Sequence, residues 1–175
     1  MSDMFLIANI TSWILLLVLA VSFLKLRKDL SGFLSDAKKP ALQNMGLNKG
    51  ERAPDKVYEL LSEQEKHSKI LVLLTSTSCD LCKRIYPALN PLQLKSKNRL
   101  KIILFTVGDE ESVKHVLDEY ELDVTAFPSL WPDIKETFRI EHIPYAYVFS
   151  NEGKVLNKGL VNSQEQLSYL LDYKL

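Results

Sequence analysis

The sequence predicts an α/β domain, in which helices flank a central mixed sheet, preceded by one transmembrane helix. Three features predict it. An uncharged apolar run lies near the N-terminus, continuous apolar segments alternate with amphipathic ones after residue 50, and a hairpin pattern follows. The 175 residues accommodate one domain of ordinary size at 51–175, an N-terminal anchor at 1–24 and a polar linker at 25–50.

The N-terminal run from Phe5 to Leu24 contains no charged residue. A helix needs about 20 apolar residues to cross a bilayer. A cleaved signal peptide would need a basic leader and a small-residue cleavage site, whereas this leader is acidic and the run ends directly at Lys25. A buried core helix would be shorter or carry some charge. We therefore expect an uncleaved, single-pass anchor.

The charge of the chain is balanced, with 22 basic and 22 acidic residues spread along it. A nucleic-acid-binding surface would show clustered basic residues, so this class is disfavoured. The positive charges that follow the apolar run, Lys25, Arg27 and Lys28, are typical of a membrane-proximal flank.

The first half of the domain predicts a parallel β-α-β-α unit. Apolar spacing indicates a short amphipathic helix from Asp55 to Lys66, and a continuous apolar run predicts a strand at Ile70–Leu74 that is buried on both faces. A helix bent at Pro87 follows. A second strand is expected at Leu100–Val107 and a helix at about Glu110–Tyr120.

The second half predicts β-β-α. The segments Tyr145–Phe149 and Val155–Lys158 flank the turn Asn151–Lys154, a pattern typical of an antiparallel hairpin. Ser163 is placed to open the last helix, with Gln166 completing a capping box.

The two cysteines of the chain form a Cys-x-x-Cys motif, Cys79-Asp80-Leu81-Cys82, between a predicted strand and a predicted helix. This spacing places both sulfurs on one helical turn, where they can form a disulfide. The free N–H groups at a helix start stabilise a thiolate, and the pKa of the first thiol in such motifs falls from about 8.5 toward roughly 3.5–7.5. We interpret Cys79 as the nucleophile and Cys82 as the resolving thiol of a thiol-disulfide oxidoreductase.

Other interpretations of the cysteine pair stay open. The pair could be a structural disulfide, or the centre of a redox-inert scaffold. A zinc site needs about four ligands, and only His67, His115 and His142 accompany the cysteines, so no metal or other cofactor is expected. The main alternative is a copper carrier that uses Cys79, Cys82 and His142. A peroxidase is less favoured, since Ser76 occupies the position of the usual threonine.

Two further features accompany the cysteine motif. Pro87 follows Cys82 by five residues, and Ile143-Pro144 precedes a predicted strand. With these features the domain resembles the thioredoxin superfamily. The resemblance implies that Ile143 and Pro144 form a cis-proline loop beside the redox pair, where an extended substrate peptide binds.

Within that superfamily the chain is similar to the membrane-anchored MauD group, which is related to TlpA and ResA. The matching motifs are Ile7–Trp13, Gly50–Pro54, Cys79–Lys83, Ile143–Ala146, Asn151–Gly153 and Lys158–Asn162. The resemblance implies a protein that forms or sorts disulfides in an exported partner, such as the small subunit of methylamine dehydrogenase. It also implies a membrane or exported redox partner and a domain on the extracytoplasmic, periplasmic side. The positive charge after the anchor alone would favour the opposite orientation.

Three positions depart from the family pattern. Asp80 stands where MauD-like proteins carry proline, and its carboxylate opposes a thiolate at Cys79, so we expect a more reducing pair. Ser78 stands where thioredoxins carry tryptophan. The strand Ile70–Leu74 lacks the buried acid of thioredoxins, so proton transfer falls to water or another group.

Overall fold

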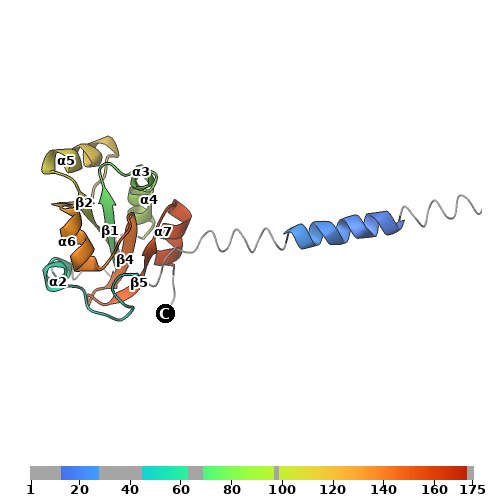
Figure 1. The fold of residues 1–175 in the computed structure, drawn as a ribbon, viewed down its shortest axis with the longest axis horizontal. Helices are drawn as coiled ribbons and strands as arrows, with labels where there is room; N and C mark the ends of the chain where they lie inside the picture. The colour runs from blue at the N-terminus through green and yellow to red at the C-terminus, as the bar shows by residue number, and fades with distance from the viewer. Residues whose placement is uncertain (1–12, 28–44, 63–68, 97–98, 173–175) are drawn as a thin grey trace, which may run out of the picture. The chain divides into compact units, whose positions relative to one another are not determined.

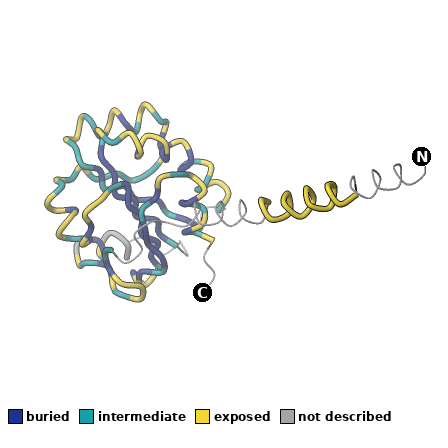
Figure 2. Tube along the Cα trace, turned by 45° about the vertical axis from the view of Figure 1, so that its right-hand side comes forward, coloured by how far each residue is buried: buried dark blue, intermediate teal, exposed yellow. Residues whose placement is uncertain are grey.

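The computed structural model describes residues 13–27, 45–62, 69–96 and 99–172, and the chain divides into two units at residues 38 and 39. In the first unit residues 13–27 form a helix whose large apolar side chains are exposed (Figures 1 and 2). Residues 5–12 of the expected transmembrane run lie outside the described residues. Within the described ranges, no helix combines the length and apolar character that a membrane span requires.

The second unit contains one five-stranded mixed sheet in the order β3-β2-β1-β4-β5. Strand β1 (Lys69–Ser76) pairs in parallel with β2 (Leu100–Val107), which pairs in parallel with β3 (Thr125–Ser129). On its other side β1 pairs antiparallel with β4 (Tyr145–Ser150), and β4 forms a hairpin with β5 (Val155–Leu160). The predicted mixed sheet and the four strands expected in it are confirmed.

Helices cover both faces of the sheet (Figure 1). They are α2 (Asp55–Ser62), α3 (Asp80–Lys83), the 3-10 turn η1 (Tyr86–Ala88), α4 (Leu89–Lys95), α5 (Glu110–Glu119), α6 (Trp131–Phe138) and α7 (Gln164–Leu171). The helix expected to bend at Pro87 is broken into α3, η1 and α4, because proline cannot continue the hydrogen-bond ladder. Ser163 caps α7 as predicted, its hydroxyl accepting a hydrogen bond from the Gln166 N–H at 3.3 Å.

The core has two halves, one on each face of the sheet, because side chains alternate along a strand. Leu71 and Leu73 of β1 pack on one face with residues of α3, η1, α4 and α7. Ile70, Val72 and Leu74 pack on the other with residues of α2 and α6. The central strand is therefore buried on both faces, as its unbroken apolar run predicts (Figure 2).

Strand β3 and helix α6 are absent from the sequence-based prediction. β3 is an edge strand of half-exposed residues interrupted by Pro128, so it shows neither a continuous apolar run nor a clean alternation. β3 is a strand because its backbone pairs with β2, and the apolar periodicity of the sequence does not reveal this pairing. The chain also joins the domain earlier than expected, because Leu47, in the predicted linker, is buried in the core and donates its N–H to the Tyr147 hydroxyl at 3.0 Å.

Candidate functional site

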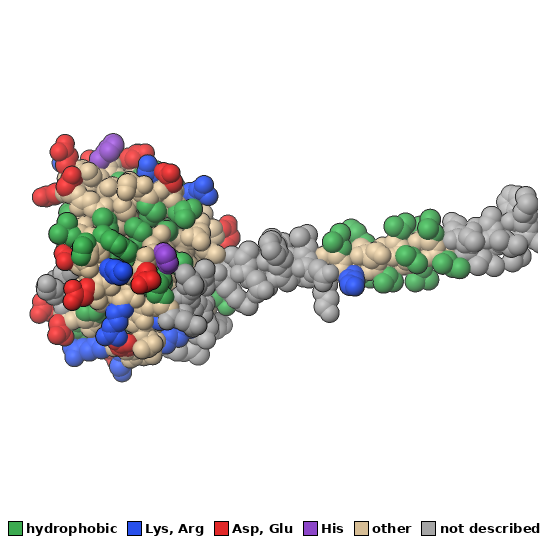
Figure 3. All heavy atoms as spheres, viewed as in Figure 1, with side chains coloured by type: hydrophobic (Ala, Val, Ile, Leu, Met, Phe, Trp, Pro, Cys, Tyr) green, Lys and Arg blue, Asp and Glu red, His purple; other side chains and the backbone are tan. Residues whose placement is uncertain are grey.

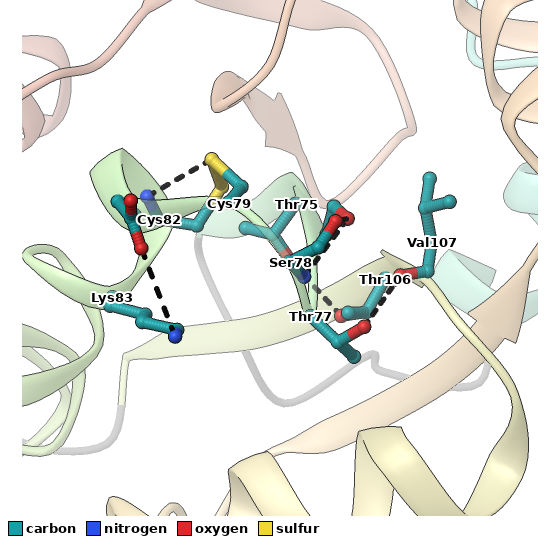
Figure 4. The surroundings of a disulfide bond; sticks show 10 residues. Thr75, Thr77, Ser78, Cys79, Cys82, Lys83, Thr106 and Val107 are labelled. Atoms are coloured by element: carbon teal, nitrogen blue, oxygen red, sulfur yellow. Dashed lines mark hydrogen bonds and ion pairs between the residues drawn. A yellow bond between two sulfur atoms is a disulfide. The ribbon is translucent and has the colours of Figure 1, made fainter.

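The two cysteines form a disulfide at the start of α3 (Figure 4). Cys79 is the N-cap residue, with extended backbone angles, and its sulfur accepts a hydrogen bond from the Cys82 N–H at 3.2 Å. The two Cα atoms are 5.3 Å apart. Because α3 has only four residues, this single N–H contact, more than a long helix dipole, is what the backbone offers to a thiolate at Cys79.

The two sulfurs differ in exposure. Cys79 is half-buried, whereas Cys82 has no exposed surface and belongs to the core cluster that includes Ile85 and Tyr86. Only the first sulfur is therefore accessible from solvent. This difference agrees with the roles expected from the sequence, in which Cys79 attacks a partner and Cys82 resolves.

The segment between β1 and Cys79 is held by a set of short-range hydrogen bonds. The Thr77 N–H donates to the Val107 carbonyl at 3.1 Å, and the Cys79 N–H donates to the Ser76 carbonyl at 3.2 Å. The Ser76 and Ser78 hydroxyls are 3.0 Å apart. These contacts fix the position of Cys79, and Ser78, which replaces the usual tryptophan, is exposed.

The dipeptide between the cysteines carries a charge and an apolar side chain. The Asp80 carboxylate lies 3.8 Å from the Lys83 ammonium, and these side chains are 91% and 45% exposed. An ion pair so open to solvent is weak, so Lys83 neutralises the Asp80 charge only in part. Leu81 is partly exposed beside them, at 39%.

The register of β1 and β4 places the Pro144 loop at the end of the sheet where the cysteines lie. β4 runs antiparallel to β1, with Tyr145 opposite Leu74. Pro144 precedes Tyr145 and β1 continues toward Cys79, so both segments leave the sheet at the same end. The Ile143-Pro144 bond is cis, Pro144 is buried and its carbonyl accepts from the Val161 N–H at 3.1 Å.

The copper-carrier alternative finds no support in the side-chain geometry. His142 is exposed, and the described ranges bring no three His, Cys, Asp or Glu side chains together in a group that could hold a metal ion. His142 therefore does not join Cys79 and Cys82 as a third ligand in this disulfide form. His67 lies outside the described residues.

Buried hydroxyl groups beside the disulfide were not identified from the sequence. The Thr75 and Thr106 hydroxyls are buried and 2.9 Å apart (Figure 4). The Tyr86 side chain is also fully buried; burial raises its pKa, and the nearby Thr75 side chain opposes part of that rise. A signal was present in the sequence, because Thr75 and Thr106 are polar residues at the ends of two apolar runs.

No family model matches the chain. Individual named proteins are similar to it. The methylamine utilization protein MauD of Paracoccus denitrificans is 22% identical over 183 residues, covering 98% of this chain and 90% of that protein. MauD of Methylorubrum extorquens is 25% identical over 187 residues, with 98% and 88% covered. The chain is similar to MauD over nearly its whole length. The thioredoxin-like protein YneN of Bacillus subtilis is also similar, at 26% identity over 125 residues, covering 65% of this chain and 72% of YneN.

Solved structures share the fold of this MauD relative. The thioredoxin domain of a thiol-disulfide oxidoreductase from Bacteroides vulgatus superposes with a TM-score of 0.57 at 19% identity, covering 70% of this chain and 96% of that one. A thiol:disulfide interchange protein DsbE described as putative, from Chlorobium tepidum, gives 0.59 at 14% identity, with 71% and 96% covered. The thioredoxin-like fold is thereby confirmed. With the Cys79–Cys82 disulfide and the similarity to MauD, it is consistent with the thiol-disulfide exchange expected from the sequence.

Proposed function

We propose that this protein is a membrane-tethered thiol-disulfide oxidoreductase that forms, reduces or sorts disulfides in an exported partner protein. The observation that carries the proposal is the unequal exposure of the two sulfurs, Cys79 half-buried and Cys82 fully buried. A structural disulfide needs no accessible member, whereas an exchange reaction needs at least one accessible sulfur.

In the proposed exchange, the Cys79–Cys82 pair and a pair of partner cysteines trade one disulfide for two thiols. When the protein acts as a reductant, the Cys79 thiolate attacks a partner disulfide, forms a mixed disulfide and expels one partner thiolate. Cys82 then loses its proton to water, attacks the Cys79 sulfur and expels the second partner thiolate, which water protonates. The reverse sequence oxidises a partner dithiol, and the relative reduction potentials set the direction.

The surface around Cys79 suits an extended peptide with apolar side chains. The Pro144 loop lies at the same end of the sheet as Cys79, and a peptide backbone can pair with this loop there. Leu81 is 39% exposed and Leu130, at the end of β3, is 67% exposed. More generally, the face of this unit drawn in Figure 3 carries apolar side chains among charged ones. Ile143 and Pro144 are accordingly proposed as substrate-binding residues.

The proposed tethering rests on the uncharged run from Phe5 to Leu24, and the proposed location rests on the resemblance to the MauD group. The MauD relatives are similar over 98% of the chain, so the similarity extends into this run. We place the thioredoxin-like domain on the extracytoplasmic side, where disulfides persist. The partner class is then an exported protein with cysteines, for which the sequence resemblance suggests the small subunit of methylamine dehydrogenase as an example.

Trapping of mixed disulfides tests the function. The Cys82→Ser chain, expressed in its native host, should accumulate partner proteins bound to Cys79, because the resolving thiol is missing. The chain with both cysteines replaced by serine is the control and should capture none. Capture by the double variant, or none by Cys82→Ser, would contradict the proposal.

Labelling of intact cells tests the location. An impermeant maleimide added to cells that express the Cys82→Ser chain should modify Cys79 without lysis. Labelling that appears only after lysis would place the domain on the cytoplasmic side.

A further inference from the structure

The attack of Cys82 on the mixed disulfide, which releases the partner, faces a physical obstacle. The Cys82 sulfur has no exposed surface and packs among apolar residues of the core. To attack the mixed disulfide it must become a thiolate, and burial in an apolar site disfavours the charged form. The β1 strand carries no acid that could take the proton, since the five residues from Ile70 to Leu74 are all apolar.

Three buried hydroxyl groups lie on the same side of the sheet as Cys82. Along β1, Leu71 and Leu73 face the core half that contains Cys82, and alternation gives Thr75 the same face. Thr106 pairs with Thr75 across β1 and β2, and Figure 4 shows both threonines to one side of the disulfide. Tyr86, four residues after Cys82 in the chain, belongs to the same core half as Cys82.

One hydroxyl of this group has no hydrogen-bond partner within the described residues. The Thr75 and Thr106 hydroxyls make one hydrogen bond to each other at 2.9 Å, in which either hydroxyl can be the donor. The Tyr86 hydroxyl is fully buried and has no hydrogen-bond partner by distance and angle within the described part of the chain, although the Thr75 side chain is near enough to lower its pKa. Buried donors without acceptors destabilise a fold, so their presence calls for an explanation.

We propose that the hydroxyls of Thr75 and Tyr86 donate hydrogen bonds to the Cys82 thiolate as it forms, with Thr106 as the positioning residue that orients Thr75. The inference rests on the proposed exchange reaction. The donors take no proton from Cys82: its proton passes to water, the Cys79–Cys82 bond forms, and the leaving thiolate receives a proton from water. Neutral donors in place of an acid stabilise the negative sulfur without adding a second negative charge.

A two-step measurement with glutathione disulfide tests this. The reduced full-length protein, in detergent, first forms a glutathione adduct at Cys79 and then releases the second glutathione by Cys82 attack. Acid quenching and mass spectrometry give the rate of each step from pH 5 to 10. Thr75→Val should slow the second step by about tenfold and move its pH midpoint upward, with the first step unchanged. Tyr86→Phe should also slow the second step and move its pH midpoint upward.

Two variants provide the controls. Thr75→Ser keeps the hydroxyl and should restore the second step to within about twofold of the wild type. Thr77→Val removes a hydroxyl already engaged with the Val107 carbonyl, at 3.4 Å, and should change neither step. An unchanged second step in Thr75→Val, equal slowing of both steps, or a slow Thr75→Ser would overturn the inference. Failure of the wild type to form the Cys79 adduct would instead refute the exchange reaction itself.

Discussion

Leu74 lies opposite Tyr145 in the antiparallel β1–β4 ladder, and this register determines the geometry of the site. Because of this register, β1 ends toward Cys79 and β4 begins after Pro144 at the same end of the sheet. A pairing shifted by one residue would reverse the faces of every side chain on β4. The site is therefore a consequence of the register of two buried strands.

The unequal burial of the sulfurs predicts selective alkylation. In the reduced protein at neutral pH, iodoacetamide should modify Cys79 at least about tenfold faster than Cys82, because Cys82 has no exposed surface. Peptide mapping by mass spectrometry measures both rates. In urea, where the domain is unfolded, the two rates should converge. Equal rates in the native protein would be inconsistent with the assigned roles.

Replacement of the Asp80 charge should make the pair more oxidising. Asp80→Asn removes a carboxylate that opposes the Cys79 thiolate, so the reduced form gains stability and the reduction potential rises. For an exposed charge we expect a rise of about 5–20 mV. Equilibration with glutathione buffers measures the potential.

The control for this substitution is Lys83→Met, which removes the partial neutralisation of Asp80 at 3.8 Å and should lower the potential. A potential in the native protein well above about −200 mV would refute the proposal that Asp80 makes the pair reducing.

Loss of the Tyr147 hydroxyl should destabilise the domain. This hydroxyl donates to the Phe138 carbonyl at 2.7 Å and accepts from the Leu47 N–H at 3.0 Å, so it ties the residues before α2 to the end of α6. Tyr147→Phe leaves both backbone groups unpaired in the core and should lower the free energy of unfolding by about 1–3 kcal/mol. Urea titration measures the change. Tyr169→Phe, at a partly exposed site, should have almost no effect.

The same tyrosine predicts a loss of stability at alkaline pH. Burial raises the pKa of Tyr147 from its usual 10 to about 12, so the folded protein keeps this proton where the unfolded chain releases it. The free energy of unfolding should therefore fall as pH rises from about 10 to about 12. Burial also raises the pKa of Tyr145, which adds to the slope. Tyr147→Phe should make the decline shallower, and an identical slope in this variant would rule out its contribution.

The sequence predicts most of the fold because β1, β2, β4 and β5 carry clear apolar patterns. β3 escapes prediction because Pro128 and half-exposed neighbours conceal an edge strand that pairs with β2. Helix α6 is absent from the prediction as well. For the site, the Cys79–Cys82 motif and the Ile143-Pro144 dipeptide are local patterns and can be recognised directly. The Thr75, Thr106 and Tyr86 group depends on strand register and on the packing of η1, which local sequence patterns do not specify.

Electron transfer from the reduced cysteine pair to a disulfide-bonded substrate can be measured directly. The reduced full-length chain, mixed with a disulfide-bonded peptide, should form the Cys79–Cys82 disulfide while the peptide gains two thiols, one peptide per chain, as read by mass spectrometry after acid quenching. The Cys79→Ser chain should leave the peptide oxidised. Equal peptide reduction by both chains, or none by the wild type, would contradict the account.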